Sequence, residues 1–114
     1  FAFADLHLLY RKNSFICMVK HIVTFKLKGS ADERRHVAEA FRDALMDLPE
    51  QIDVLRSMEV GINENPAEDW DVVLTAVVPT MSDVAVYAGH PAHIAAAAII
   101  SAHKETRACV DYEF

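Results

Sequence analysis

The sequence has little cysteine and a shortage of positive charge, and each shortage argues against a class of protein. Only two of the 114 residues are cysteines, Cys17 and Cys109, and they lie far apart without a C-x-x-C motif. Neither a disulfide framework nor a thiolate zinc site is therefore expected, and a reducing cytoplasm fits best. Eleven Lys and Arg against 17 Asp and Glu give a formal net charge of -6, with no basic run. Binding to nucleic acid is not expected from such a chain, because that binding depends on clustered cations.

Long apolar runs are also missing. Even the most apolar stretch, Ala92 to Ile100, contains His93 and is shorter than the roughly 20 residues that span a bilayer, so we expect no membrane segment. A chain that is 53% apolar at this length suits one domain with a single core. Regular patterning begins at Met18. We therefore predict an extension of unclear origin over residues 1–17 and a domain over residues 18–114.

The hydrophobic period changes several times along the domain, and the changes predict the order βαββαβ. Alternation predicts a strand over residues 19–27, in which His21 shares the apolar face. Ser30 and Glu33 have the spacing of a capping box, which predicts a helix that ends at Pro49. Further apolar runs predict a hairpin of strands over about 54–62 and 70–78, and a last strand over 107–114.

The second helical region is interrupted. Thr80 or Ser82 can cap a helix that carries Tyr87, and Pro91 suits the first turn of a second helix, which we expect to run to about Lys104. Together the elements fit a ferredoxin-like α+β fold, in which a four-stranded antiparallel sheet carries its helices on one face.

The other face of that sheet is expected to pair with a second copy of the chain. In the strand over 70–78, the face that carries Val72 and Leu74 is apolar, but Val73 and Val77 make the opposite face partly apolar as well. An exposed sheet face of this kind usually needs a partner. We therefore predict a homodimer that pairs through the two sheet faces.

Tyr87, His90 and His93 lie within seven residues and are the main concentration of reactive side chains. Histidine is the side chain whose ordinary pKa lies nearest neutrality, and a tyrosine hydroxyl can hold a carbonyl or enolate oxygen. In the predicted fold these residues mark a helix break above the strand that carries His21. The group can support proton transfer, or it can supply hydrogen bonds that fix the helix break.

Three segments resemble the stress-responsive A/B barrel domain family: Val19-Lys-His-Ile-Val-Thr-Phe-Lys, Tyr87-x-x-His-Pro-x-His and Val110-Asp-Tyr-Glu. The resemblance covers Met18 to Phe114 and implies a dimeric α+β barrel, in which two sheets form the barrel and the helices pack outside. It does not imply one activity. Most members are known as small proteins of undefined role, some are associated with stress, and a plant relative, olivetolic acid cyclase, closes and aromatises a polyketide chain.

The resemblance to the cyclase implies roles for individual residues in a pocket between sheet and helices. The implied catalytic residues are Tyr87, His93 and His21, with His90 as their neighbour in the motif. We expect His90, Phe25 and Val72 to contact the ligand. In an aldol-type cyclisation, an imidazole removes a proton beside a carbonyl while a hydroxyl stabilises the oxygen on which charge grows. Such cyclase or lyase chemistry needs no redox cofactor. Val72 departs from the cyclase, which has an imidazole at that position.

Three functions remain open from the sequence. The first is a protein that binds, or cyclises, a small apolar or polyketide-like molecule, and the second is a non-catalytic dimeric stress or structural protein. The third is a monooxygenase, which rests on fold analogy alone. His90 and His93 have i,i+3 spacing, but no third metal ligand lies near them unless His21 joins, so we expect neither a metal nor another cofactor.

Overall fold

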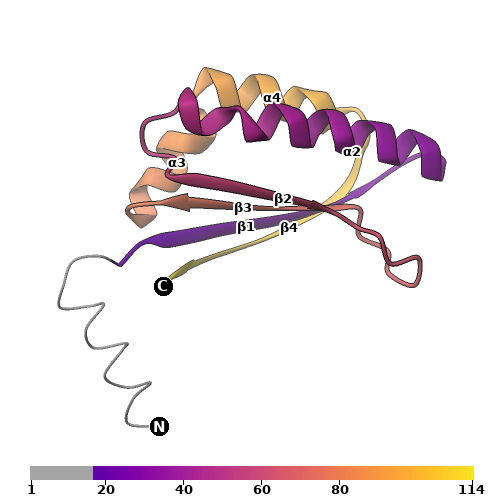
Figure 1. Ribbon diagram of the computed structural model, residues 1–114, viewed down its shortest axis with the longest axis horizontal. Coiled ribbons are helices and arrows are strands. Elements are labelled where there is room, and N and C mark those ends of the chain that lie inside the picture. The colour runs from indigo at the N-terminus through magenta and orange to yellow at the C-terminus, as the bar shows by residue number, and fades with distance from the viewer. Residues whose placement is uncertain (1–16) are drawn as a thin grey trace, which may run out of the picture.

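The computed structural model describes residues 17–114, which form a four-stranded antiparallel sheet with helices on one face (Figure 1). The strand order is β2-β3-β1-β4, which is the predicted ferredoxin-like arrangement. The elements are β1 (Val19–Leu27), α2 (Ala31–Met46), a 3-10 helix (Leu48–Glu50), β2 (Ser57–Ile62), β3 (Val72–Val78), α3 (Met81–Gly89), α4 (Pro91–Ser101) and β4 (Lys104–Glu113). Apart from Cys17, the extension predicted over residues 1–17 lies outside the described residues.

The start of α2 follows the predicted capping box. The backbone N–H of Glu33 donates to Ser30 Oγ at 3.2 Å, and Glu33 Oε1 accepts from the backbone N–H of Ser30 at 3.3 Å. These bonds satisfy backbone donors that have no partner inside the helix. The chain reaches this cap through Gly29, whose φ of 108° is a conformation that side-chain-bearing residues rarely adopt.

Several element boundaries differ from the prediction. α2 ends at Met46, before the 3-10 helix that contains Pro49, and β4 begins at Lys104 and not at residue 107. β2 begins at Ser57 and not near residue 54, because the preceding residues form a turn in which Leu55 N–H donates to Ile52 O at 3.0 Å. β3 begins at Val72, two residues after the predicted start. α4 ends at Ser101, because Lys104 already pairs with Leu27 as the first residue of β4.

The break between α3 and α4 lies at His90. This residue is extended, with ψ of 138°, and its Nδ1 accepts a hydrogen bond from the backbone N–H of Ala92 at 3.0 Å. Pro91 follows as the first residue of α4, where its missing N–H costs nothing. Among the described residues, no single helix is long and apolar enough to cross a bilayer, and the pair α3 and α4 that passes this test together is bent by 71°.

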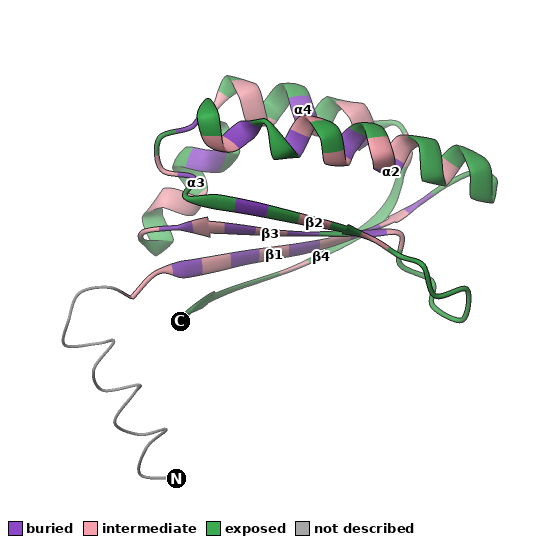
Figure 2. Ribbon diagram, in the orientation of Figure 1, coloured by how far each residue is buried: buried purple, intermediate pink, exposed green. Residues whose placement is uncertain are grey.

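The core lies between the helices and the sheet face that they cover, and the second face is open (Figure 2). Along β1 every second residue, from Val19 to Leu27, is buried against the helices. In β4 the distribution is reversed, with apolar side chains on the open face and polar side chains toward the helices. Its Val110 pairs with Ile22 on the open face and is 62% exposed, while Asp111 pairs with His21 on the helix side.

Candidate functional site

A cavity of about 640 Å³ lies between the β1 and β4 half of the sheet and the helices α3 and α4. Part of its wall is apolar and includes Val23, Phe25, Phe41, Leu74 and Ile100. Its polar lining consists of His21, His93, Lys104, Arg107, Cys109 and Asp111. A mainly apolar cavity of this size with a few polar groups is typical of a small-molecule site.

Strand pairing positions the first polar group in the cavity. His21 and Asp111 are directly opposite in the β1–β4 ladder, and His21 Nδ1 lies 2.5 Å from Asp111 Oδ1. Cys109 is two residues before Asp111 on the same side of β4, and its Sγ lies 3.5 Å from His21 Nδ1. Burial and the charge of Asp111 raise the pKa of the Cys109 thiol. The His21 side chain is buried, and its imidazole forms a hydrogen-bonded pair with the Asp111 carboxylate at one end of the cavity.

His93 is the second imidazole that lines the cavity, and its contacts leave one nitrogen available as a base. Its Nδ1 lies 2.9 Å from the carbonyl oxygen of Ala88. A carbonyl oxygen only accepts, so Nδ1 carries the proton and Nε2 carries the lone pair. Burial lowers the pKa of His93 below its usual value; the bond to Ala88 opposes this shift, and the charges of His21 and Arg107 add to it. The neutral, proton-accepting form is therefore favoured near pH 7.

Tyr87 lies behind these two imidazoles and does not line the cavity. Its ring is fully buried, with its centroid 4.6 Å from that of His93 and 5.8 Å from that of His21, both in edge-on contact. The hydroxyl has no hydrogen-bond partner among the described residues, and burial raises the pKa of Tyr87 well above its ordinary value. The cavity thus reaches one member of the predicted Tyr87–His93 pair, while the other member supports the rings from behind.

The remaining predicted ligand-binding residues are placed differently from one another. Phe25 lines the cavity, but His90 and Val72 do not. The ring of His90 caps α4, and Val72 borders a shallower hollow around Trp70. Neither of these two residues reaches the cavity in this arrangement.

Asp111, Cys109 and Arg107 are cavity residues that the sequence reasoning did not select. The alternation in the last predicted strand places all three on the side opposite Val110, and Asp111 lies within the Val110-Asp-Tyr-Glu segment. Their grouping with His21 follows from the β1–β4 register, which that alternation does not provide.

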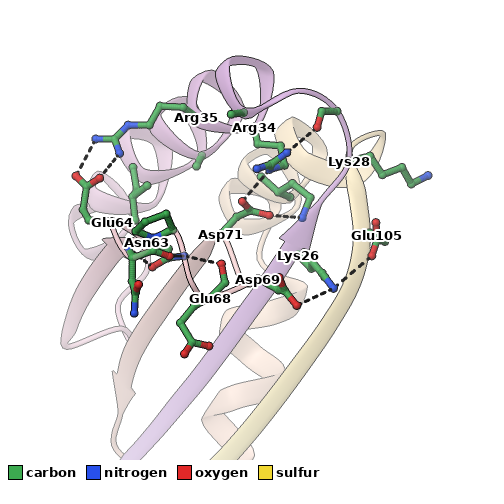
Figure 3. A pocket seen from close by; sticks show the side chains of 17 residues that line it. Lys26, Lys28, Arg34, Arg35, Asn63, Glu64, Glu68, Asp69, Asp71 and Glu105 are labelled. Carbon is green, nitrogen blue, oxygen red and sulfur yellow. Dashed lines mark hydrogen bonds and ion pairs between the residues drawn. The ribbon is translucent and has the colours of Figure 1, made fainter.

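A second hollow, of about 680 Å³, lies at the far end of β1, and most of the charged residues that line it pair with one another (Figure 3). Asp71 accepts hydrogen bonds from Leu27 N–H at 2.7 Å and from Arg34 Nε at 3.1 Å. Arg35 holds Glu64 through both guanidinium NH groups. Because these charges already have partners, the hollow is better explained as a clamp between α2, β1 and the β2–β3 loop than as a ligand site.

Comparison with known proteins places this arrangement in a family. The model of the stress responsive A/B barrel domain, Dabb, matches residues 19–114. A dimeric protein of unknown function with a ferredoxin-like fold from Bacteroides fragilis is 47% identical, with a TM-score of 0.82 over 85% of this chain and 96% of that chain.

Two more distant structures share the fold. A dimeric ferredoxin-like protein of unknown function from Thermobifida fusca is 24% identical, with a TM-score of 0.69 over 86% of this chain and 92% of that chain. A hydroxynitrile lyase from Passiflora edulis is 14% identical, with a TM-score of 0.63 over 85% and 93% of the two chains. None of the curated proteins matches. The chain belongs to the stress responsive A/B barrel domain family.

Proposed function

We propose that the protein binds a small, mainly apolar carbonyl compound in the cavity between sheet and helices, and that His93 accepts a proton from the carbon beside the carbonyl. The observation that carries this proposal is a cavity of about 640 Å³ whose apolar walls end in two imidazoles and two cationic side chains. The walls suit an apolar or polyketide-like body, and the polar end suits its oxygen.

The proposed step uses the free nitrogen of His93. The C–H bond beside the carbonyl breaks, its proton moves to His93 Nε2, and the electron pair moves to the carbonyl oxygen to give an enolate. Arg107 and Lys104 line the same cavity and favour that negative charge. Return of the proton restores the ketone, and attack of the enolate carbon on a second carbonyl of the same molecule would close a ring. General-base help of this kind typically accelerates a reaction about 10²- to 10⁴-fold.

Deuterium exchange tests the step without knowledge of the natural ligand. We expect 4-butylacetophenone in D2O to exchange the hydrogens beside its carbonyl faster with the wild-type protein than in buffer, as followed by proton NMR. His93→Ala should reduce the protein-dependent rate at least about 100-fold. His36→Ala is the matched control, because His36 is exposed on α2 and outside the cavity lining, and it should keep the full rate.

The same experiment separates the alternatives. Binding of the ketone, seen as chemical-shift changes at cavity residues, without any exchange would point to a carrier. Absence of both binding and exchange would contradict the proposal and favour the non-catalytic dimeric protein, an interpretation that the burial of Tyr87 outside the cavity also fits. Equal exchange rates for His93→Ala and wild type would exclude His93 as the base.

We also propose that two copies pair through their open sheet faces. The open face carries Val110, Tyr112 and Val73, which are 62%, 41% and 39% exposed. Solved relatives are described as dimeric, which supports this interpretation. Val110→Asp should give a monomer in sedimentation velocity, whereas Val86→Asp, at a position on α3 that is 53% exposed, should remain dimeric. A dimeric Val110→Asp protein would contradict pairing through this face.

A further inference from the structure

We propose that His21, Cys109 and Asp111 form a binding site for one divalent transition metal ion, with Zn²⁺ the best suited. The three residues each offer one ligand atom, and these atoms all lie within 4.8 Å of one another. This inference goes beyond the proposed function and does not rest on it, because His93 can act as a base whether or not a metal occupies the neighbouring group.

The separations of the ligand atoms are close to those of a tetrahedral zinc site. Zinc bonds of about 2.3 Å to sulfur and about 2.1 Å to nitrogen and oxygen place sulfur about 3.6 Å from either of the other atoms, and nitrogen about 3.4 Å from oxygen. Cys109 Sγ lies 3.5 Å from His21 Nδ1 and 3.6 Å from Asp111 Oδ1. Only the 2.5 Å contact between His21 and Asp111 must widen, by about 0.9 Å.

The strands supply the rigidity that such a site needs. His21 and Asp111 are direct partners in the β1–β4 ladder, and Cys109 is the diagonal neighbour on the same face. The His21 side chain is 8% exposed and the Asp111 side chain is 30% exposed. The buried imidazole is thus fixed, and the more exposed carboxylate is the group that can rotate to admit the ion.

The chemistry of the three ligands selects the class of metal. A thiolate and a carboxylate balance the charge of a divalent ion, and the mixture of sulfur, nitrogen and oxygen suits Zn²⁺ or Co²⁺ better than Mg²⁺ or Ca²⁺, which prefer oxygen. Binding must displace the proton of the Cys109 thiol, break the hydrogen bond between His21 and Asp111, and overcome the nearby charge of Arg107. A thiol that coordinates a metal ion loses its proton, so the metal–sulfur bond offsets part of the free energy that deprotonation costs.

All three residues line the cavity, so a fourth coordination position would face it. Zinc sites with three protein ligands and one open position bind water or substrate at the open one. A ligand oxygen in the cavity could therefore meet the ion directly.

Cobalt titration tests the site with the metal alone. Reduced protein, freed of metal with EDTA, is titrated with Co²⁺ and the near-ultraviolet sulfur-to-cobalt charge-transfer band is recorded; Zn²⁺ is then added to displace the cobalt. We expect one Co²⁺ per chain and displacement by one equivalent of Zn²⁺. Cys109→Ser should abolish the band, and Asp111→Asn should weaken affinity by more than the roughly 10- to 100-fold that a change outside the ligand set typically causes.

Cys17→Ser is the matched control, because it removes the second thiol and leaves the three ligands intact. It should keep the band and the stoichiometry, and circular dichroism should show that every variant is folded. Absence of saturable binding to the wild-type protein would overturn the proposal, as would a band that survives in Cys109→Ser but disappears in Cys17→Ser. The deuterium exchange assay is performed in EDTA, so failure of the metal site and failure of the proton transfer are observed separately.

Discussion

Replacement of Tyr87 by Phe should make the protein more stable, although Tyr87 opens the Tyr-x-x-His-Pro-x-His segment that resembles the family. The side chain is 0% exposed and its hydroxyl has no hydrogen-bond partner among the described residues. A buried polar group without a partner costs about 1–3 kcal/mol, because it has lost water and gained nothing in exchange. Phenylalanine keeps the ring contacts with His21 and His93 and removes the hydroxyl.

The expected gain in the free energy of unfolding is therefore about 1 kcal/mol. With a slope of about 2 kcal/mol per M of urea, the unfolding midpoint should rise by about 0.5 M. Ser101→Ala is the control, because its exposed hydroxyl already donates to the carbonyls of Ala97 and Ala98, and its loss should change stability by less than about 0.5 kcal/mol.

A loss of stability in Tyr87→Phe would refute this reasoning. It would mean that the hydroxyl finds a partner in solution, such as a buried water molecule, and that the polar end of the cavity extends behind the imidazoles. Stabilisation together with unchanged deuterium exchange would instead identify Tyr87 as a structural residue.

The remaining predictions concern pH, the clamp and two glycines. Because burial lowers the pKa of His93 from its ordinary 6.5, the unfolded chain binds more protons just below that pH. The free energy of unfolding should therefore be highest above about pH 7 and should decline as the pH falls through 6.5. In urea unfolding, His93→Gln should show a shallower decline over the same pH range. Asp71→Ala should cost about 1–3 kcal/mol in urea unfolding, whereas Asp69→Ala, at an 81% exposed side chain, should cost less than about 0.5 kcal/mol. Gly29→Ala should lower the thermal midpoint because its φ is 108°, and Gly89→Ala, with open space around it, should raise stability by up to about 1 kcal/mol.

The elements with local signals are those that the sequence predicts well. Alternation identifies β1 from Val19 to Leu27, and the Ser30 to Glu33 cap identifies the start of α2, because both patterns depend only on neighbouring residues. The starts of β2 and β4 depend on which distant residue each strand pairs with. Lys104 is therefore expected in a helix but lies in a strand, since its pairing with Leu27 has no local signature.

The site residues also fall into those that local patterns predict and those that depend on contacts between distant segments. The apolar-face position of His21 follows from alternation, and its proximity to His93 follows from the fold. The contact with Asp111 requires the register between strands that are about ninety residues apart, and no periodic pattern specifies that number. His90 is close to Tyr87 and His93 in sequence, but it does not line the cavity. Its ring accepts a hydrogen bond from the backbone N–H of Ala92 and caps α4 instead.

β4 places polar side chains in the cavity and apolar side chains on the open face, and this arrangement couples the two surfaces. One side of this edge strand carries Asp111, Cys109 and Arg107 into the cavity, and the other exposes Val110 and Tyr112 on the face that we propose pairs with a second copy of the chain. A shift of the strand would disturb both surfaces at once, so the proposed subunit association and the proposed ligand binding would be linked equilibria, and each would change the other by the same factor. Ligand affinity should then depend on protein concentration near the dimer dissociation constant.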